Sequence, residues 1–250
     1  MLPILQVGPL AIQMPGLILL AGVWIAVSLT DREAPRYSLK PSTLSNMILI
    51  GLVVGILSAR LWYAIRFFDI YLDNPLSIFS LNPTTLAPLE GALTGLAVAA
   101  FYGYRKGLPL WPTLDVLTPG LAAFGLAVGF AHLASGDAFG METSLPWAIE
   151  LWGAQRHPTQ IYEVLAAGFI FWLIWEFRRK TQVAGFLFLI FIALIALSRL
   201  VIEAFRGDSI IAYGSIRNAQ LGSLLVLAVA LVGMHLLARA QTQEPKGRSS

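Results

Sequence analysis

Three charged residues near the end of one long apolar stretch form the first set that could do chemistry. Arg199 and Glu203 are four residues apart, and Arg206 follows three residues later. On a continuous helix all three would share one face, because residues three and four apart are neighbours there. The carboxylate could then pair with one arginine and leave the other for an anionic ligand such as phosphate. The alternative is a self-neutralising structural pair. In both cases Arg199 is expected to lie deeper than Arg206.

A second set runs from Arg156 to Glu163 with the sequence RHPTQIYE. Pro158 suits the first turn of a helix. Arg156 and His157 would then lie beside the positive end of the helix dipole, which attracts phosphate. His157 could act as a base, since imidazole exchanges a proton near neutral pH. The alternative is that His157 only donates a hydrogen bond.

A third candidate is Glu90, in the sequence LEGALTG, beside small residues that let helices approach closely. Desolvation would favour its protonated form, which suits a proton acceptor. It could equally be the ion-pair partner of Arg60, which lies inside another apolar stretch, or of Arg199. Asp115 is interpreted as a cap or loop anchor rather than a reactive group.

The composition indicates which kind of element must hold these groups. Of 250 residues, 57% are hydrophobic and 12% are charged, and the mean hydropathy is +0.72. A soluble domain carries about a quarter charged residues, so the composition argues against a soluble enzyme and against a disordered chain. The dispersed basic residues and a net charge of +3 do not indicate nucleic-acid binding. The absence of cysteine removes disulfides, thiolate metal sites and a cysteine nucleophile.

Seven stretches are long enough to cross a bilayer, which takes about 20 apolar residues. They cover residues 10–30, 45–68, 86–104, 114–135, 160–177, 184–206 and 219–239. We therefore predict an all-α, polytopic membrane protein with seven transmembrane helices. Residues 1–240 would form a single domain with outer segments at 69–85 and 136–159, followed by a polar cytoplasmic tail at 241–250.

The basic residues indicate the orientation of the chain. Most of the 17 follow odd-numbered stretches, and the positive-inside rule places that side in the cytoplasm. The N-terminus is then outside and the C-terminus is cytoplasmic. The others are all arginines of the outer half, namely Arg60, Arg66, Arg156, Arg199, Arg206 and Arg217. An unpaired arginine costs about 3 kcal/mol or more at mid-membrane, and guanidinium matches phosphate best. We therefore expect a site for an anionic lipid headgroup. The alternative is that carboxylates pair with these arginines and lock helices together.

In these motifs the chain resembles the prolipoprotein diacylglyceryl transferase family, in order and over most of its length. The segment 156–163 is the most specific match. The others are 8–16, Ala59–Leu61, Glu90–Leu93, Asp115–Gly120, Leu145–Glu150, Arg199–Arg206 and Gln220.

The chain also departs from the family pattern. The signature arginine falls on Gly129. At the other positions considered, His132 and Ser135 replace asparagines, Pro15 and Ile195 replace tyrosines, and Asp137 and Gly140 keep the expected character.

The resemblance implies a reaction. The diacylglyceryl group of phosphatidylglycerol moves to the lipobox cysteine thiol of a prolipoprotein, and glycerol-1-phosphate is released, as the first step of bacterial lipoprotein maturation. It also implies a multi-pass protein of the bacterial plasma (inner) membrane that is surrounded by membrane lipid. We expect a monomer with no cofactor, no metal and no nucleic-acid partner.

The resemblance also implies roles for individual residues. Arg199 is expected to bind the headgroup phosphate, and Glu90 or His157 to be the base, with Glu90 preferred for its motif position. The expected supporting and substrate-binding residues are Arg60, Asp137, Arg156, Gln160, Tyr162, Glu203 and Arg206, of which Asp137 and Gln160 would orient the glycerol or the peptide.

Two alternatives remain open at this point. A degenerate paralogue would bind lipid or prolipoprotein without turnover; the arginine missing at Gly129 favours it, whereas the motifs 156–163 and 199–206 favour the enzyme. A small lipid or solute transporter would carry charged residues through the full membrane depth. Here they are concentrated in the outer half, which argues against a transporter.

Overall fold

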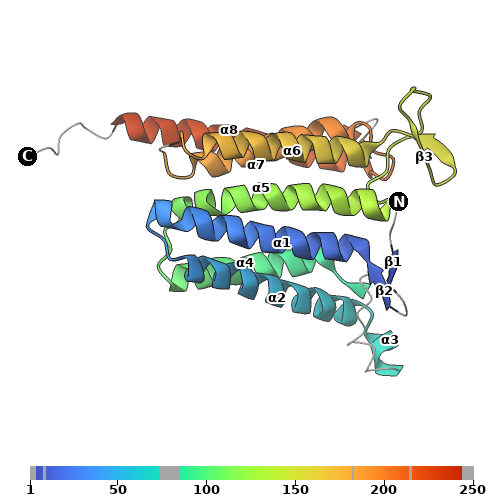
Figure 1. The fold of residues 1–250 in the computed structure, drawn as a ribbon, viewed down its shortest axis with the longest axis horizontal. Helices are drawn as coiled ribbons and strands as arrows, with labels where there is room; N and C mark the ends of the chain where they lie inside the picture. The colour runs from blue at the N-terminus through green and yellow to red at the C-terminus, as the bar shows by residue number, and fades with distance from the viewer. Residues whose placement is uncertain (1–3, 8–9, 74–84, 182, 214–215, 244–250) are drawn as a thin grey trace, which may run out of the picture. The chain divides into compact units, whose positions relative to one another are not determined.

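Long apolar helices make up most of the chain in the computed structural model, which describes residues 4–7, 10–73, 85–181, 183–213 and 216–243 (Figure 1). The α-helices are α1 (Met14–Glu33), α2 (Pro41–Arg66), α3 (Phe68–Asp73), α4 (Pro88–Arg105), α5 (Leu110–Ser135), α6 (Thr159–Phe177), α7 (Phe186–Glu203) and α8 (Asn218–Gln243), with a 3-10 turn η1 at Ala34–Tyr37. Each of the seven predicted stretches overlaps one long helix, although the bounds differ. A helix bonds its own backbone internally, as a chain in lipid must.

Six of these helices are long and apolar enough to cross a membrane, within the residues that the structure describes. They are α1, α2, α5, α6, α7 and α8. The chain is therefore a polytopic helical membrane protein. The seventh helix, α4, is not among the six; its 18 residues include Glu90, Arg105 and three buried glycines, which lower its hydropathy. The count of seven spans thus stays a prediction.

Short strands lie before α1 and in the connections between later helices, as far as the described residues show. They form three antiparallel pairs: β1 (Ile4–Val7) with β2 (Leu10–Gln13), β3 (Ile149–Leu151) with β4 (Ala154–Arg156), and β5 (Ile211–Tyr213) with β6 (Ile216–Arg217). Because residues 10–13 pair as a strand, the first helix begins at Met14 and not at residue 10 as predicted. Pro15 is the second residue of this helix.

Other predicted boundaries differ from the structure. The fourth long helix begins at Leu110 rather than at 114, so Pro119 lies inside α5 instead of near its start. Pro158 immediately precedes α6 and is not in its first turn. Of the predicted outer segment 69–85, residues 74–84 lie outside the described residues, as does the predicted tail from residue 244 onward.

The chain divides into two compact units, one of residues 1–30 with 110–250 and one of residues 31–109. The single domain predicted for 1–240 therefore stays a prediction. In the second unit, α2 and α4 pack with their backbones in close approach. A Cβ atom added at Gly91 would lie 2.7 Å from the carbonyl oxygen of Gly55, and one added at Gly95 would lie 2.5 Å from that of Gly51. Small residues are what such a contact requires.

In the first unit, the buried core joins α5, α6 and α7 through Ala122, Ile170, Ile174, Leu187 and Phe191. A carboxylate fixes the start of α7 from a different helix. The buried side chain of Asp115 on α5 accepts hydrogen bonds from the N–H groups of Gly185, at 2.6 Å, and Phe188, at 2.9 Å. These are N–H groups that a helix cannot bond internally at its first turn. The interpretation of Asp115 as a cap is confirmed, and the helix that it caps is α7.

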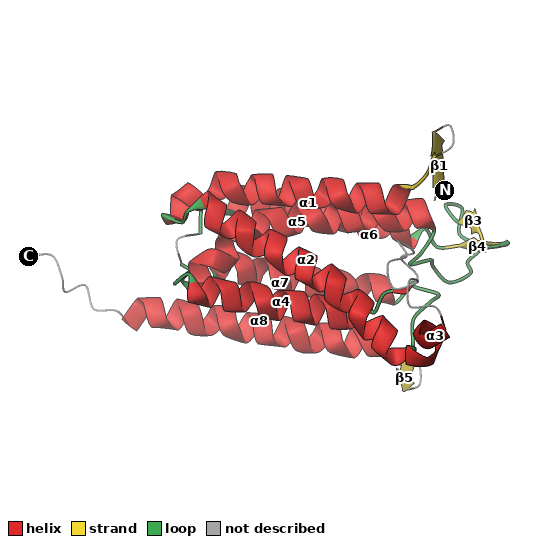
Figure 2. Cartoon of the chain, turned by 90° about the horizontal axis from the view of Figure 1, so that it is seen from below, coloured by secondary structure: helices red, strands yellow, loops and turns green. Residues whose placement is uncertain are grey.

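One end each of α5, α6, α7 and α8 lies at the same end of this unit. Helix α5 ends there, α6 begins, α7 ends and α8 begins, and the β3–β4 connection lies at the same end (Figure 2). The polar residues singled out in α6 and α7 are therefore brought together at this end.

Candidate active site

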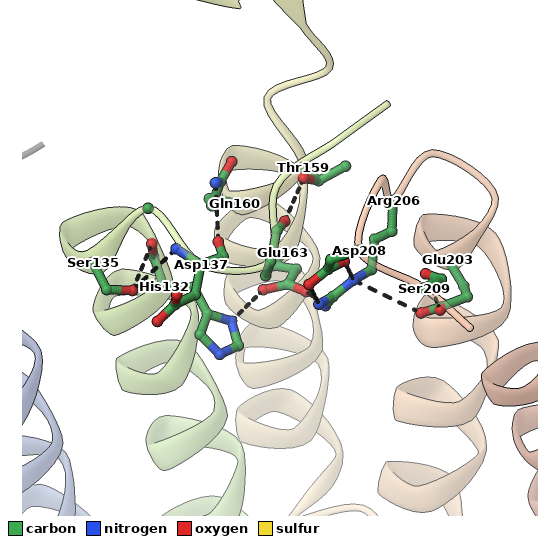
Figure 3. Close-up of polar contacts among 12 residues, drawn as sticks. His132, Ser135, Asp137, Thr159, Gln160, Glu163, Glu203, Arg206, Asp208 and Ser209 are labelled. Carbon is green, nitrogen blue, oxygen red and sulfur yellow. Dashed lines mark hydrogen bonds and ion pairs between the residues drawn. The ribbon is translucent and has the colours of Figure 1, made fainter. Parts of the chain in front are cut away.

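Glu163, in the second turn of α6, lies at the centre of a polar cluster (Figure 3). Its Oε2 lies 2.7 Å from Nδ1 of His132 on α5. Its Oε1 lies 2.9 Å from Nη1 of Arg206 and 3.6 Å from Nη1 of Arg199. One carboxylate thus joins α5 and α6 to the end of α7.

Arg206 lies beyond the end of α7, because the helix stops at Glu203. The prediction that Arg206 continues the helix face of Arg199 and Glu203 is therefore wrong. Its guanidinium instead turns back into the cluster. Nε and Nη2 donate to the two oxygens of Asp208, at 2.9 and 2.6 Å, while Nη1 pairs with Glu163. The side chain is only 10% exposed. Its donors are used on both edges, so Arg206 is built to hold carboxylates in place.

The charges of Arg206 and Asp208 reinforce one another. Burial disfavours the charged form of Arg206, but the hydrogen bond and charge of Asp208, with Glu163 and Glu203, outweigh it and raise the pKa of Arg206. Burial likewise opposes ionisation of Asp208, and its hydrogen bond to Arg206 outweighs this and lowers the pKa of Asp208. Both Arg206 and Asp208 are therefore charged at neutral pH.

Arg199 differs from Arg206 in its accessibility. Its Nε lies 3.0 Å from Oε2 of Glu203, as the spacing of four residues predicted. The side chain of Arg199 is 40% exposed, whereas that of Glu203 is 2% exposed. Oε1 of Glu203 also accepts a hydrogen bond from the hydroxyl of Ser209. Arg199 is thus held by Glu203 at its Nε edge and more loosely by Glu163 at Nη1, and its side chain is still partly exposed, which suits contact with an anion.

The segment 139–141 is hydrogen-bonded to the backbone after α7 and to the backbone before α6. The bonds are Met141 N–H to Phe205 O (2.8 Å), Gly207 N–H to Phe139 O (2.8 Å) and His157 N–H to Met141 O (3.0 Å). Gly140 is required at this crossing, since a Cβ atom there would lie 2.2 Å from the carbonyl oxygen of His157. The backbones of Arg206 and His157 are therefore both packed closely against the segment 139–141.

Arg156 is used within the connection after α5. Its Nε donates to Leu151 O at 3.1 Å, Nη1 donates to Gly140 O at 3.3 Å, and Nη2 pairs with Glu142 at 3.3 Å. These contacts hold the β3–β4 hairpin. The structure does not bring Arg156 into contact with Glu163 within the part of the chain that it describes.

His157 and Tyr162 lie in an aromatic group beside the cluster. The His157 ring centroid is 5.2 Å from that of Phe205 and 6.3 Å from that of Tyr162. Nδ1 of His157 is buried without a hydrogen-bond partner among the described residues. The hydroxyl of Tyr162 accepts a hydrogen bond from Nε1 of Trp147 at 2.9 Å. His157 is thus packed as an aromatic residue.

Gln160 and Asp137 are joined through the backbone. Gln160 is fully buried, and its Nε2 donates to the carbonyl oxygen of Asp137 at 3.0 Å. The neighbouring Thr159 donates to the carbonyl oxygen of Ala138 at 2.6 Å. These bonds fix the turn after α5 and leave Asp137 itself exposed. Gln160 therefore positions the turn from inside.

Glu90 and Arg60 belong to the second unit and are described within it. Glu90 forms an ion pair with Arg66. Nη1 of Arg60 donates to the carbonyl oxygen of Thr85 at 2.8 Å and to its hydroxyl. Both groups thus have partners within their own unit.

Sequence reasoning gave no site role to several cluster residues, namely His132, Glu163, Asp208 and Ser209, and it counted Arg217 only among the outer-half arginines. Arg217 donates to the carbonyl oxygen of Arg206. Two signals could have found some of them. Glu163 closes the motif that begins at Arg156, and Asp208 lies two residues after Arg206. No group of three or more His, Asp or Glu side chains is arranged to hold a metal ion in the described ranges.

The comparison with known families gives the cluster its context. A family model described as prolipoprotein diacylglyceryl transferase matches residues 3–236. The chain belongs to this family. Three relatives are each named phosphatidylglycerol–prolipoprotein diacylglyceryl transferase. The one from Streptococcus pneumoniae is 31% identical over 243 residues (93% of this chain, 90% of the relative), the one from Shouchella clausii 30% over 257 (96% and 91%), and the one from Synechococcus elongatus 30% over 248 (92% and 85%).

Gly129, where the resemblance predicts an arginine in this prolipoprotein diacylglyceryl transferase family, lies at a close contact between two helices. A Cβ atom at Gly129 would lie 3.1 Å from Cγ2 of Val164 and 3.3 Å from its Cα and N atoms. Helices α5 and α6 are therefore in close approach at this level. His132 follows Gly129 by three residues, and Glu163 precedes Val164, so the close approach lies beside the contact between them.

Proposed function

We propose that this chain transfers the diacylglyceryl group of phosphatidylglycerol to the lipobox cysteine thiol of prolipoproteins and releases glycerol-1-phosphate. Membership of the family over residues 3–236 and the names of its relatives support the proposal. The structural observation that carries it is Arg199, an accessible guanidinium anchored on the buried Glu203 at the end of an apolar helix. An anionic lipid headgroup needs such a cation where its acyl chains can still lie against apolar side chains.

In this reaction the thiol sulfur attacks the glycerol carbon that carries the phosphate. A carbon–sulfur bond forms, the carbon–oxygen bond breaks, and glycerol-1-phosphate leaves with the electron pair. A cation fixed beside the leaving phosphate stabilises the charge that develops on it. Arg199 is proposed for this role. Glu203 and Glu163 hold Arg199, and Arg206 holds Glu163.

The remaining residues expected from the sequence have supporting roles in the proposal. Gln160 and Arg156 fix the turn and the hairpin after α5, and Asp137 presents its exposed side chain to the glycerol or the peptide. Tyr162 is held by Trp147 beside this hairpin. The roles expected for Glu90 and Arg60, in the second unit, stay predictions. Of the two candidate bases, Glu90, which was preferred for its motif position, forms an ion pair with Arg66, and Nδ1 of His157 is buried.

We also infer that the chain spans the membrane seven times as a single-domain monomer in the bacterial plasma membrane. The N-terminus would be outside and the C-terminus cytoplasmic, with the tail 241–250 on the cytoplasmic side. The distribution of basic residues supports this orientation. It places the end of the first unit that carries Arg199 and Glu163 on the outer side.

A turnover assay on the purified protein tests the function. Phosphatidylglycerol and a lipobox peptide are supplied, and the release of glycerol-1-phosphate is followed. Wild type is expected to release it, and Arg199→Ala to be slower by about 100-fold or more, the range for loss of one charge-stabilising donor. Arg179→Ala, beyond the opposite end of α6, is the matched control and is expected to match wild type. Folded wild type that binds the lipid without releasing glycerol-1-phosphate would indicate a paralogue without turnover.

A further inference from the structure

The proposed reaction needs an acceptor for the thiol proton, and His132 has the contacts of one. Its Nδ1 faces Oε2 of Glu163 at 2.7 Å, while Arg206 and Arg199 contact Oε1. An ionised carboxylate accepts hydrogen bonds and donates none. The hydrogen of a neutral His132 ring therefore belongs on Nδ1, directed at Glu163. This leaves the lone pair on Nε2, which points away from Glu163 (Figure 3).

The ring of His132 is also reachable. Its side chain is 33% exposed, compared with 14% for Glu163. It lies in the last turn of α5, and Arg199 contacts the same Glu163 carboxylate. By contrast, the His157 ring packs against Phe205. Of these two histidines, His132 alone has a carboxylate contact that orients its ring within the described residues.

We propose that His132 is the general base of the transfer, with Glu163 as the residue that orients it; this rests on the proposed function. Nε2 takes the proton from the lipobox thiol as the sulfur forms its bond to the glycerol carbon. The electron pair of the broken carbon–oxygen bond leaves with glycerol-1-phosphate. The proton then passes from His132 to the phosphate or to water, which restores the neutral ring.

The charges around the ring suit this step. Glu163 faces His132 from α6, and behind it lie Arg199 on α7 and Arg206 in the segment after α7, with Asp208 bound to Arg206. The carboxylate next to the ring stabilises the imidazolium that forms, as the carboxylate does in a serine-protease triad. The two arginines favour the leaving phosphate. The positive charge that develops on the ring therefore lies beside the carboxylate of Glu163, and the negative charge on the leaving phosphate is stabilised by the arginines.

The test follows glycerol-1-phosphate release from phosphatidylglycerol and a lipobox peptide between about pH 5.5 and 9.5, a range that brackets the thiol pKa of about 8.5. For His132→Gln we expect kcat to fall by about 100-fold or more near pH 7, the usual contribution of a general base, with KM for the lipid nearly unchanged. The deficit should narrow as the pH passes the thiol pKa, since the thiolate then forms without a base. His235→Gln, on α8, is the matched control and should follow wild type.

A second variant keeps the inference testable if His132→Gln does not fold. In wild type, kcat should fall toward acid pH as the base becomes protonated, and we call this fall the acidic limb. Glu163→Gln removes the charge that stabilises the imidazolium, so the acidic limb of the variant should lie at lower pH than that of wild type. The inference is overturned if His132→Gln keeps kcat within tenfold and keeps that limb, or if His157→Gln removes the limb instead. It is also overturned if Glu163→Gln leaves the limb in place. Wild type that releases no glycerol-1-phosphate at any pH would overturn the proposed function itself, and His132 with it.

Discussion

Arg199 and Arg206 contact the same oxygen of Glu163, yet the side chain of Arg199 is 40% exposed and that of Arg206 is 10% exposed. The difference follows from where α7 ends. Arg199 lies on the helix, whereas Arg206 lies after its end and pairs with Gly140 in an isolated antiparallel bridge. One arginine is therefore suited to a ligand, and the other to holding the cluster.

This difference predicts opposite effects of two matched substitutions. Arg206→Ala leaves Asp208 without its partner and leaves Oε1 of Glu163 with only the longer contact to Arg199, and removing one member of a buried pair costs about 3–5 kcal/mol. Its melting temperature in detergent should fall well below that of wild type. Arg199→Ala should keep a melting temperature near that of wild type and lose turnover. Equal destabilisation by both variants would contradict the assignment.

The ion pair between Arg206 and Asp208 predicts an acid limit to stability. The pKa of Asp208 is lower in the folded protein than its ordinary value of 3.8. The stabilisation is therefore fully present above about pH 4 and is lost as the pH falls through the lower folded pKa. Melting temperature measured from about pH 6 down to 2.5 should decline below pH 4 in wild type. Asp208→Asn should start from a lower melting temperature and show a smaller decline; an unchanged decline would place its source in another carboxylate.

Gly140 offers a test of the crossing that carries Arg206 and His157. In Gly140→Ala the new Cβ atom would lie 2.2 Å from the carbonyl oxygen of His157, which is backbone and cannot rotate away. Overpacking typically costs about 1–3 kcal/mol, and more where the backbone must move. We expect a lower melting temperature and slower turnover. Gly125→Ala is the matched control, since nothing lies within 4 Å of its Cβ position and it lies inside α5.

The cap on α7 can be tested in two steps. Asp115→Ala removes both acceptors of the Gly185 and Phe188 N–H groups, and loss of a cap costs about 0.5–2 kcal/mol. Asp115→Asn keeps one carbonyl acceptor, so its loss of stability should be smaller. Thermal unfolding of the two variants beside wild type gives the order. If both variants melt with wild type, the two hydrogen bonds contribute nothing to stability.

The sequence allowed the helices to be predicted better than the contacts between them. Hydropathy located all seven long helices, because each apolar stretch must satisfy its own backbone in lipid. The pair of Arg199 and Glu203 followed from helix spacing, which is local. The contact of His132 with Glu163 joins residues 31 apart, and that of Arg206 with Glu163 joins residues 43 apart. No periodicity within one helix reports such pairs.

The end of α7 shows the same limit. The apolar pattern continues through Phe205, so it favours a helix as far as Arg206. The structure ends the helix at Glu203, and the next residues make backbone hydrogen bonds to Phe139 and Met141. Those partners lie in the connection after α5. Tertiary contacts therefore decided the boundary, and with it the direction in which Arg206 points.

The close approach at Gly129 predicts that the residues tolerated at positions 129 and 164 depend on one another. An arginine restored there would meet the backbone of Val164 as well as its side chain, so a different rotamer at 164 would not make enough room. Helix α6 would have to shift, and Glu163 with it. We therefore expect positions 129 and 164 to covary among relatives, and Gly129→Arg on its own to lower both stability and turnover. Introducing an arginine at position 129 would then require more than one substitution.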